Sequence, residues 1–168
     1  AAPYLAALRE ELRLTAEMMA GRRLDAVYVG GGTPTSLTAE ELRALLLFVR
    51  ETFDFSACRE FTVEAGRPDS ITREKLLALR EAGVDRISIN PQTLKQATLD
   101  LIGRFHTVEQ FTESFALARE LGFDNINTDL IMGLPNETEA DVRRTMEGIR
   151  ALSPDDVTIH SLALKRAA

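Results

Sequence analysis

Apolar and polar residues alternate along this chain with two different periods. Short apolar runs with a period of two are typical of strands, and stretches with apolar residues every three or four positions are typical of helices. The short runs predict strands over 25–30, 60–65, 86–90, 125–131 and 156–162. The longer stretches predict helices over 2–19, 38–51, 72–82, 107–121 and 138–152. Strands that alternate with helices predict an α/β fold with a parallel sheet and right-handed crossovers.

The residues at the expected helix ends fit the conformations that helix ends require. A Thr followed three positions later by Glu or Gln can form a capping box, in which each side chain accepts from the other residue's backbone N–H. Gly83 and Gly122 lie where helices should end, and glycine readily adopts the left-handed conformation found there. Capping boxes are expected for Thr38 with Glu41 and for Thr107 with Gln110, and a weaker version for Thr138 with Asp141.

One short segment occurs twice. REAGVDRISI at 80–89 matches RELGFDNINT at 119–128, and their separation is close to the length of one strand–helix unit. Repeated units favour a barrel-like array over an open sheet, and no linker-like stretch of Gly, Ser or Pro divides the chain. We therefore expect one domain over 1–168, a partial parallel βα barrel of about five strand–helix units.

One face of the predicted sheet is polar in four successive strands, although parallel sheets covered on both faces have nearly continuous apolar strands. Burying an unpaired polar group costs roughly 1–3 kcal/mol. Three interpretations are open. The side chains of this face hydrogen-bond to one another, they face solvent, or they line a lumen that holds a polar ligand or water. The recurrence of the pattern favours the lumen. The polar positions are Thr62, Glu64, Ser88, Asn90, Asn127, Asp129, Thr158 and His160, and the apolar positions between them should meet the helices.

The loops that follow the strands hold the least ordinary residues, at the end of a barrel where ligands bind. GGGTPTSL at 30–37 has three glycines, so another molecule can approach backbone groups able to pair with an amino group or a carboxylate. No Gly-Lys-Ser/Thr follows, which excludes a phosphate loop.

Four side chains in these regions are candidates for binding a small polar molecule. A carboxylate at a strand end, such as Glu64 or Asp129, can accept two sugar hydroxyls. Gln92 can donate and accept nearby, and Arg104 can pair with a ligand carboxylate. For each residue alone, a structural role is an equally good interpretation. Because all four lie at strand ends, the set is stronger evidence for a ligand site than any single member.

The composition and net charge of the chain exclude several classes of binding partner. The net charge is −6 and no segment clusters Lys and Arg, which argues against a nucleic-acid partner. No apolar run is long enough to span a membrane. The single cysteine, Cys58, cannot form an internal disulfide, and it cannot hold an iron–sulfur cluster alone. We expect a cytoplasmic protein with a small-molecule substrate.

Five segments, in this order and spacing, resemble oxygen-independent coproporphyrinogen III oxidases, which are radical S-adenosylmethionine (SAM) enzymes of haem biosynthesis. They are YVGGGTPTSL, TVEAGRPDSIT, DRISINPQTL, IGRFHTVEQF and NINTDLIMGLP, and the resemblance runs from about Leu24 to Ala163. Most members have Gly-Val-Gln where this chain has Asn90-Pro91-Gln92. This form and the AGRPD segment resemble the coproporphyrinogen dehydrogenase-like branch.

The resemblance implies the partial six-stranded βα barrel of radical SAM enzymes and a role for each candidate. Gly31, Gly32 and Thr33 would meet the SAM amino group, and Glu64 with Arg104 would hold its methionyl end. Gln92 and Asp129 would take the ribose hydroxyls, and the backbone of Ala163 would touch the adenine.

The family binds a [4Fe–4S] cluster through a Cys-x3-Cys-x2-Cys loop upstream of the glycine motif, and this sequence has no such loop. We therefore expect a fragment of a longer enzyme, without the first strand, the cluster loop and the C-terminal substrate domain. No metal ligand is expected in the chain itself. The alternative is a natural relative that lacks the cluster.

The implied reaction is radical oxidative decarboxylation, in which coproporphyrinogen III propionates become vinyl groups. An electron donor reduces the cluster, and SAM then supplies the radical that abstracts hydrogen. Two alternatives stay open. One is another radical SAM reaction, such as methyl transfer or haem handling, and the other is a non-catalytic SAM- or haem-binding module. A cysteine triad upstream would favour an enzyme.

Overall fold

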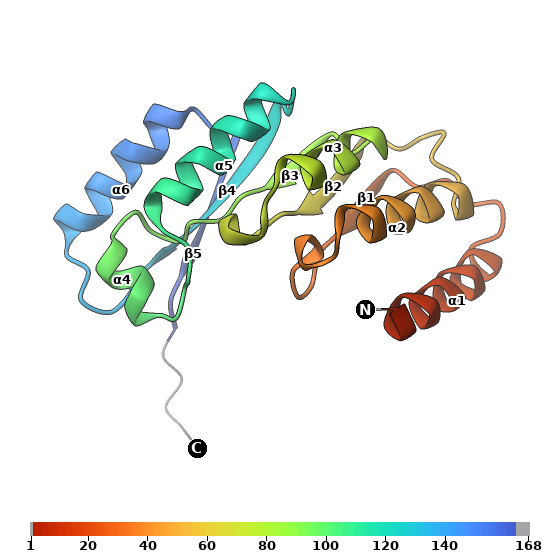
Figure 1. Cartoon of the computed structure of the whole chain (residues 1–168), viewed down its shortest axis with the longest axis horizontal. Coiled ribbons are helices and arrows are strands. Elements are labelled where there is room, and N and C mark those ends of the chain that lie inside the picture. Colours follow the sequence, from red (N-terminus) through yellow and green to blue (C-terminus); the bar gives the residue numbers. More distant parts are fainter. Residues whose placement is uncertain (1, 164–168) are drawn as a thin grey trace, which may run out of the picture.

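The computed structural model describes residues 2–163, in which strands and helices alternate as the sequence predicts (Figure 1). The described strands form one parallel sheet whose spatial order follows the chain order. The outer strands each pair on one side, so the sheet stays open. The strands are β1 (Ala26–Val29), β2 (Glu60–Glu64), β3 (Arg86–Ser88), β4 (Asn125–Met132) and β5 (Asp156–Ser161).

The long helices begin and end within a residue or two of the predicted positions. They are α1 (Ala2–Met18), α2 (Ala39–Thr52), α3 (Arg73–Glu81), α5 (Val108–Glu120) and α6 (Glu139–Leu152). Both expected capping boxes form, and the one at Thr138 is also complete because Asp141 accepts from the Thr138 backbone N–H at 2.9 Å. Three short helical segments were not predicted: η1 (Pro34–Ser36), η2 (Pro68–Ser70) and α4 (Gln96–Leu101).

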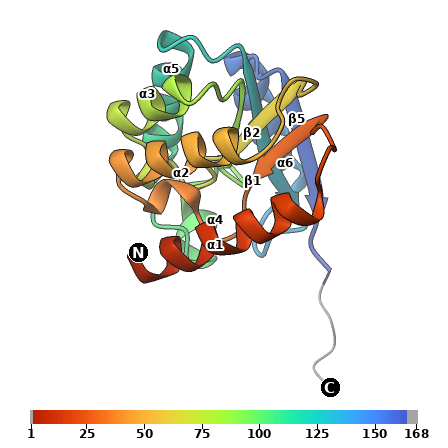
Figure 2. The same cartoon turned by 90° about the vertical axis from the view of Figure 1, so that its right-hand side faces the viewer.

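The core lies between the sheet and the helices. Figure 2 shows α2, α3 and α5 together on one side of the strands. The apolar strand positions are buried against them, and each fully buried large aliphatic or aromatic side chain contributes roughly 1.5–3 kcal/mol. The core includes Phe61, Val63, Ile87, Ile89, Ile126 and Leu130 from the strand segments and Leu42, Leu46, Leu76, Phe111, Phe115 and Ile149 from the helices. Ile159 departs from the expected pattern, since it lies on the edge strand and is 48% exposed.

The polar strand positions share the other face. Residues paired in a parallel ladder point to the same side of the sheet, and successive residues alternate. Glu64 pairs with Ser88, Ser88 with Asn127, and Asp129, two residues further on, with Thr158. The prediction that Glu64 and Asp129 lie on the same face is therefore confirmed.

Candidate functional site

A polar cavity of about 320 Å³ lies at the carboxyl ends of β1, β2 and β3. Parallel α/β proteins bind ligands at this end of the sheet. The cavity brings together six of the predicted site residues, from segments far apart in the sequence, and adds three others. Its lining consists of Gly31, Gly32, Thr33, Glu64, Gly66, Arg67, Asn90, Gln92 and Arg104.

The glycine loop presents backbone to this cavity. Gly31 has a φ of +105°, a conformation that side-chain-bearing residues rarely adopt, and a Cβ placed at Gly31 or Gly32 would meet nothing within 4 Å. The end of the loop is fixed, because the Thr35 and Ser70 hydroxyl oxygens lie 2.6 Å apart and the Lys75 ammonium donates to the Thr35 carbonyl at 2.6 Å. The hydrogen bonds at Thr35 therefore fix one end of the loop, while the backbone at Gly31 and Gly32 stays accessible.

Glu64 lies at the end of β2, between two glycines that make room for its carboxylate. A Cβ at Gly30 would lie 2.9 Å from Oε2, and a Cβ at Gly66 would lie 3.0 Å from Oε1. The Tyr28 hydroxyl donates to Oε2 at 3.2 Å. Burial and the Glu64 carboxylate raise the pKa of Tyr28, so the hydroxyl keeps its proton. Within residues 2–163, no cationic group lies within 4.0 Å of Glu64, which leaves the carboxylate able to bind a ligand cation.

Gln92 and Arg104 reach the cavity from two further loops. Backbone hydrogen bonds to β4 fix Gln92, since its N–H donates to the Asp129 carbonyl and its carbonyl accepts from Ile131. It has a φ of +70° and is 7% exposed. Arg104 follows α4, and its backbone N–H donates to Leu99 at 2.9 Å. The unpredicted helix α4 therefore positions one of the predicted site residues.

Asp129 lies beside the cavity and is not among its lining residues. Its carboxylate accepts from the Asn127 amide at 2.7 Å and lies 3.8 Å from the His160 ring. The Asn127 amide also reaches Ser88, and its oxygen accepts from Thr158 at 3.0 Å. The polar face thus combines two of the alternatives left open above: a network that satisfies itself along β3, β4 and β5, and a cavity beside it.

Ala163 lies outside the cavity lining as well. It is exposed and follows edge strand β5, on the far side of β3 and β4 from the glycine loop. The backbone there is held to β4, since the Leu162 N–H donates to the Met132 carbonyl at 2.8 Å. The structure therefore spreads the predicted site along the sheet, with one group of residues at the cavity and Asp129 and Ala163 further on.

Sequence reasoning did not include Gly66, Arg67 and Asn90 among the site residues. Asn90 is 3% exposed, and its side-chain oxygen accepts from the Asp129 backbone N–H at 3.1 Å. Its position on the polar face of the predicted sheet could have identified Asn90 as a site residue. Gly66 and Arg67 follow directly after β2, so their place at a carboxyl end of the sheet was the signal for them.

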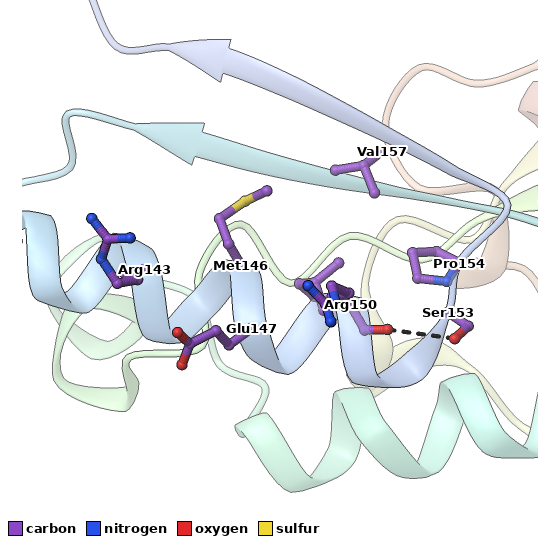
Figure 3. Close-up of a pocket in the computed structure, with 8 residues that line it drawn as sticks. Arg143, Met146, Glu147, Arg150, Ser153, Pro154 and Val157 are labelled. Atoms are coloured by element: carbon purple, nitrogen blue, oxygen red, sulfur yellow. Dashed lines mark hydrogen bonds between the residues drawn. The ribbon is translucent and has the colours of Figure 1, made fainter.

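A larger groove lies on the helix side of the sheet, between α6 and β5 (Figure 3). Its volume is about 610 Å³, and Met146 and Val157 face each other across it from the helix and the strand. Its charged residues, Arg143, Glu147 and Arg150, all come from α6. The groove lacks polar groups that converge from several elements, which a specific polar site requires. The smaller cavity is the better candidate.

The chain offers few ligands for a metal. Among residues 2–163, no group of three His, Cys, Asp or Glu side chains is placed to hold one. Cys58 lies before β2, where its thiol lies 3.3 Å from the Glu60 carbonyl oxygen. An iron–sulfur cluster takes three or four cysteines and the sequence has one, so the cluster's ligands are not in this chain. Among the described helices, none has both the length and the apolar character needed to cross a bilayer.

The sequence model of the Radical SAM superfamily matches residues 3–149, most of the chain. This chain belongs to the radical SAM superfamily. The family uses SAM together with a [4Fe–4S] cluster.

Individual relatives agree with this assignment. The oxygen-independent coproporphyrinogen-III oxidase-like protein HemZ of Bacillus subtilis (strain 168) is 49% identical over 147 residues, covering 87% of this chain and 29% of HemZ. The heme chaperone HemW of the same organism is 37% identical, covering 96% of this chain and 43% of HemW. The structure of the Escherichia coli coproporphyrinogen III oxidase HemN, a radical SAM enzyme, matches with a TM-score of 0.87 at 32% identity, covering 96% of this chain and 37% of HemN.

The predicted resemblance and the partial radical SAM barrel are therefore confirmed. The chain spans less than half the length of each of these relatives. The absence of a first strand, a cluster loop and a C-terminal domain stays a prediction, as do the cytoplasmic location and the role of each site residue.

Proposed function

We propose that this chain is the SAM-binding part of a radical SAM enzyme that decarboxylates the propionates of a porphyrinogen. The observation that carries the proposal is the cavity at the ends of β1, β2 and β3, where Glu64 has no cationic partner within residues 2–163. Its volume of about 320 Å³ lies within the range of small-molecule sites, roughly 300–1,000 Å³, at the lower end.

The groups present fit the amino-acid end of SAM, which carries an ammonium and a carboxylate on one carbon. A carboxylate without a cation suits the ammonium, and a guanidinium suits the carboxylate. Glu64 and Arg104 line the same cavity, and the Glu64 carboxylate lies close to both Gly30 and Gly66. This chemistry supports a zwitterionic ligand over a purely anionic one.

In the proposed complex each site residue has one task. Gly31, Gly32 and Thr33 meet the SAM amino group, and Glu64 and Arg104 hold the methionyl end. Gln92 and Asp129 bind the ribose hydroxyls, and the Ala163 backbone touches the adenine. The Asn127 amide, 2.7 Å from Asp129, holds that carboxylate toward the sheet and orients it.

When bound beside a reduced cluster, SAM supplies the radical chemistry that removes a hydrogen atom from a substrate. This chain's residues bind and orient SAM, as proteins commonly do for cofactors that carry the difficult chemistry. In the proposed enzyme, the cysteines that hold the cluster and the electron donor that reduces it lie outside this chain.

The porphyrinogen substrate is supported by the names of the relatives HemN and HemZ. A second candidate is a haem-binding chaperone, because HemW is 37% identical over 96% of the chain. Anaerobic incubation of the complete gene product, with its cluster, SAM, coproporphyrinogen III, a reductant for the cluster and an acceptor for the electron that leaves the substrate radical, separates the two. Release of carbon dioxide supports the oxidase. Stoichiometric haem binding, seen as a Soret band, without carbon dioxide release supports the chaperone.

Calorimetric titration of SAM into the complete gene product tests the site itself. Glu64→Gln keeps the shape and removes the charge that would meet the ammonium. We expect SAM to bind about tenfold to a hundredfold more weakly, since hydrogen bonds to charged groups contribute roughly 1.5–3 kcal/mol. Glu139→Gln is the matched control, because Glu139 is 87% exposed and pairs with Arg143 away from the cavity. Equal SAM affinity in both variants and the wild type would contradict the proposed site.

A further inference from the structure

Arg67 lines the same cavity as Glu64 and Arg104, and none of the roles assigned above includes it. Its backbone is tied to the glycine loop. The Arg67 carbonyl accepts from the Ser70 N–H at 2.9 Å and from the Ser70 hydroxyl at 2.7 Å, and that hydroxyl oxygen lies 2.6 Å from the Thr35 hydroxyl. Arg67 is therefore held in place beside the backbone that the cavity exposes.

The Arg67 guanidinium packs on an aromatic ring, and its side chain is 38% exposed. It lies over the ring of Phe105, 5.9 Å from the centroid, in a cation–π contact. Its one ion pair among the described residues is with Asp69, at a long 3.5 Å. A guanidinium has five N–H donors, so most of them stay available for a ligand.

Arg67 and Arg104 act on the same buried side chain. His106 is 1% exposed, and its pKa is lowered mainly by burial and further by the positive charges of Arg104 and Arg67. The hydrogen bond with the Pro91 backbone and the Asp69 carboxylate act on the pKa of His106 in the opposite direction. Arg104 forms no ion pair with another described residue.

The cavity has an excess of positive charge on its arginine side. Glu64 is the acidic residue in its lining, and neither guanidinium lies within the 4.0 Å of an ion pair with it. Positive and negative groups that do not neutralise each other match a ligand with both charges. A substrate propionate has no ammonium to meet Glu64, whereas an α-amino acid end has both groups.

We propose that Arg67 is a second carboxylate-binding residue, which together with Arg104 holds the α-carboxylate of SAM while the α-ammonium lies at Glu64. The inference rests on the proposed function, because it takes SAM as the ligand. Two planar guanidinium groups can donate to both carboxylate oxygens, which fixes the orientation of the methionyl end more firmly than one.

The test compares two ligands that differ in the amino-acid end. SAM and 5′-methylthioadenosine share the adenosine and the sulfur, but methylthioadenosine has neither carboxylate nor ammonium. Each is titrated calorimetrically into the complete gene product, as wild type and as Arg67→Gln. The variant should weaken SAM binding about tenfold, the loss expected from one charge-assisted contact, and leave methylthioadenosine binding within about twofold.

Two further variants complete the design. Arg143→Gln makes the same charge change on α6, at a side chain that is 69% exposed, and should leave both affinities unchanged. Arg67→Lys keeps the charge without the planar fork, and should recover part of the SAM affinity. A melting curve for each variant checks the fold.

The outcomes separate this inference from the proposed function. If Glu64→Gln weakens SAM binding and Arg67→Gln does not, SAM binds in the cavity and the role of Arg67 is wrong. An equal loss for SAM and methylthioadenosine in Arg67→Gln also overturns it, because a structural defect does not distinguish the ligands. If the wild type binds no SAM, the proposed function fails and this inference fails with it.

Discussion

The two halves of the polar sheet face use similar side chains in opposite ways. At β4 and β5, Asn127 reaches Ser88, Asp129 and Thr158 at once, and these groups satisfy each other. At the ends of β2 and β3, Glu64 has one hydrogen bond, from Tyr28. A polar residue on a strand can therefore be structural or can bind a ligand, and its neighbours decide which. Partners within reach make it structural, and their absence leaves it able to bind a ligand.

The largest effect on folding is expected in the satisfied half of the polar face, which comprises Ser88, Asn127, Asp129 and Thr158. Asn127→Leu removes the buried amide that links three polar groups, of which Ser88 is buried and Asp129 and Thr158 are half-buried. The free energy of unfolding should fall by about 2–4 kcal/mol, since each buried group left unsatisfied costs roughly 1–3 kcal/mol. Urea denaturation measures the loss. Glu64→Gln, in the open half, should change it by less than about 0.5 kcal/mol. If both variants lost the same free energy of unfolding, the two halves would not differ in their structural role.

Asp129 lies where the two halves meet, and its variant tells which half it serves. Asp129→Asn keeps the shape and removes the charge proposed to accept two ribose hydroxyls. SAM affinity should fall by about one to two powers of ten, with little change in the melting temperature. Calorimetry and a melting curve measure both. If folding stability falls sharply and SAM affinity does not change, Asp129 belongs to the internal network alone.

The sequence predicted the strands and long helices well because their apolar residues recur with the period of a strand or a helix, even in the edge strands β1 and β5, which have no fully buried residue. It could not predict where β3 ends as a strand. Pro91 has no N–H for the ladder, and the Asn90 side chain accepts from the Asp129 backbone instead. The helix α4 is too short for an apolar period to be visible, so the position of Arg104 also had to come from the structure.

The candidate site was predictable residue by residue but not as a cavity. Alternation placed Glu64 and Asp129 on one face, which the register confirms. It could not tell that Asn127 would hold the Asp129 carboxylate, because that bond depends on side-chain conformation. Nor could it place the guanidinium of Arg67, which depends on the ring of Phe105 in a different loop.

A smaller effect is expected from filling the space around Glu64. In Gly66→Ala the added methyl group would lie 3.0 Å from Oε1, so the carboxylate must move by a few tenths of an ångström. SAM affinity should fall about threefold to tenfold, because a charge-assisted hydrogen bond weakens as its geometry departs from the optimum. An unchanged affinity in Gly66→Ala would mean that this position of Glu64 is not the binding one.

A pH effect is expected at Asp141, which lies in the first turn of α6 and bonds to Thr138 and Lys95. Hydrogen bonds from Thr138 and Lys95 hold the pKa of Asp141 far below its usual 3.8. Because the folded pKa is lowered, this stabilisation is fully present above about pH 4 and is lost as the pH falls toward the folded pKa. The melting temperature of the wild type should exceed that of Asp141→Asn at pH 7, and the gap should narrow below pH 4. A constant gap would contradict the assignment.

The smallest effect is expected from Tyr28→Phe, which removes the one hydrogen bond that Glu64 has among the described residues. Tyr28 is 61% exposed, so the loss of its hydroxyl should cost less than about 1 kcal/mol in stability. SAM affinity should change by less than about threefold, because the ligand ammonium, rather than Tyr28, is the main proposed partner of Glu64. If Tyr28→Phe lowered SAM affinity as much as Glu64→Gln does, Tyr28 rather than the ligand would be the main partner of Glu64. The open half would then be structural, like the satisfied half.

A crystal structure of the complete gene product with SAM bound tests the central claim most directly. We predict SAM at the carboxyl ends of β1, β2 and β3, with its ammonium within hydrogen-bond distance of Glu64 and its carboxylate at Arg104 and Arg67. The groove between α6 and β5, though larger, should hold no SAM. SAM bound in that groove, or bound with Glu64 turned away from it, would contradict the division of the polar face into a satisfied half and a binding half.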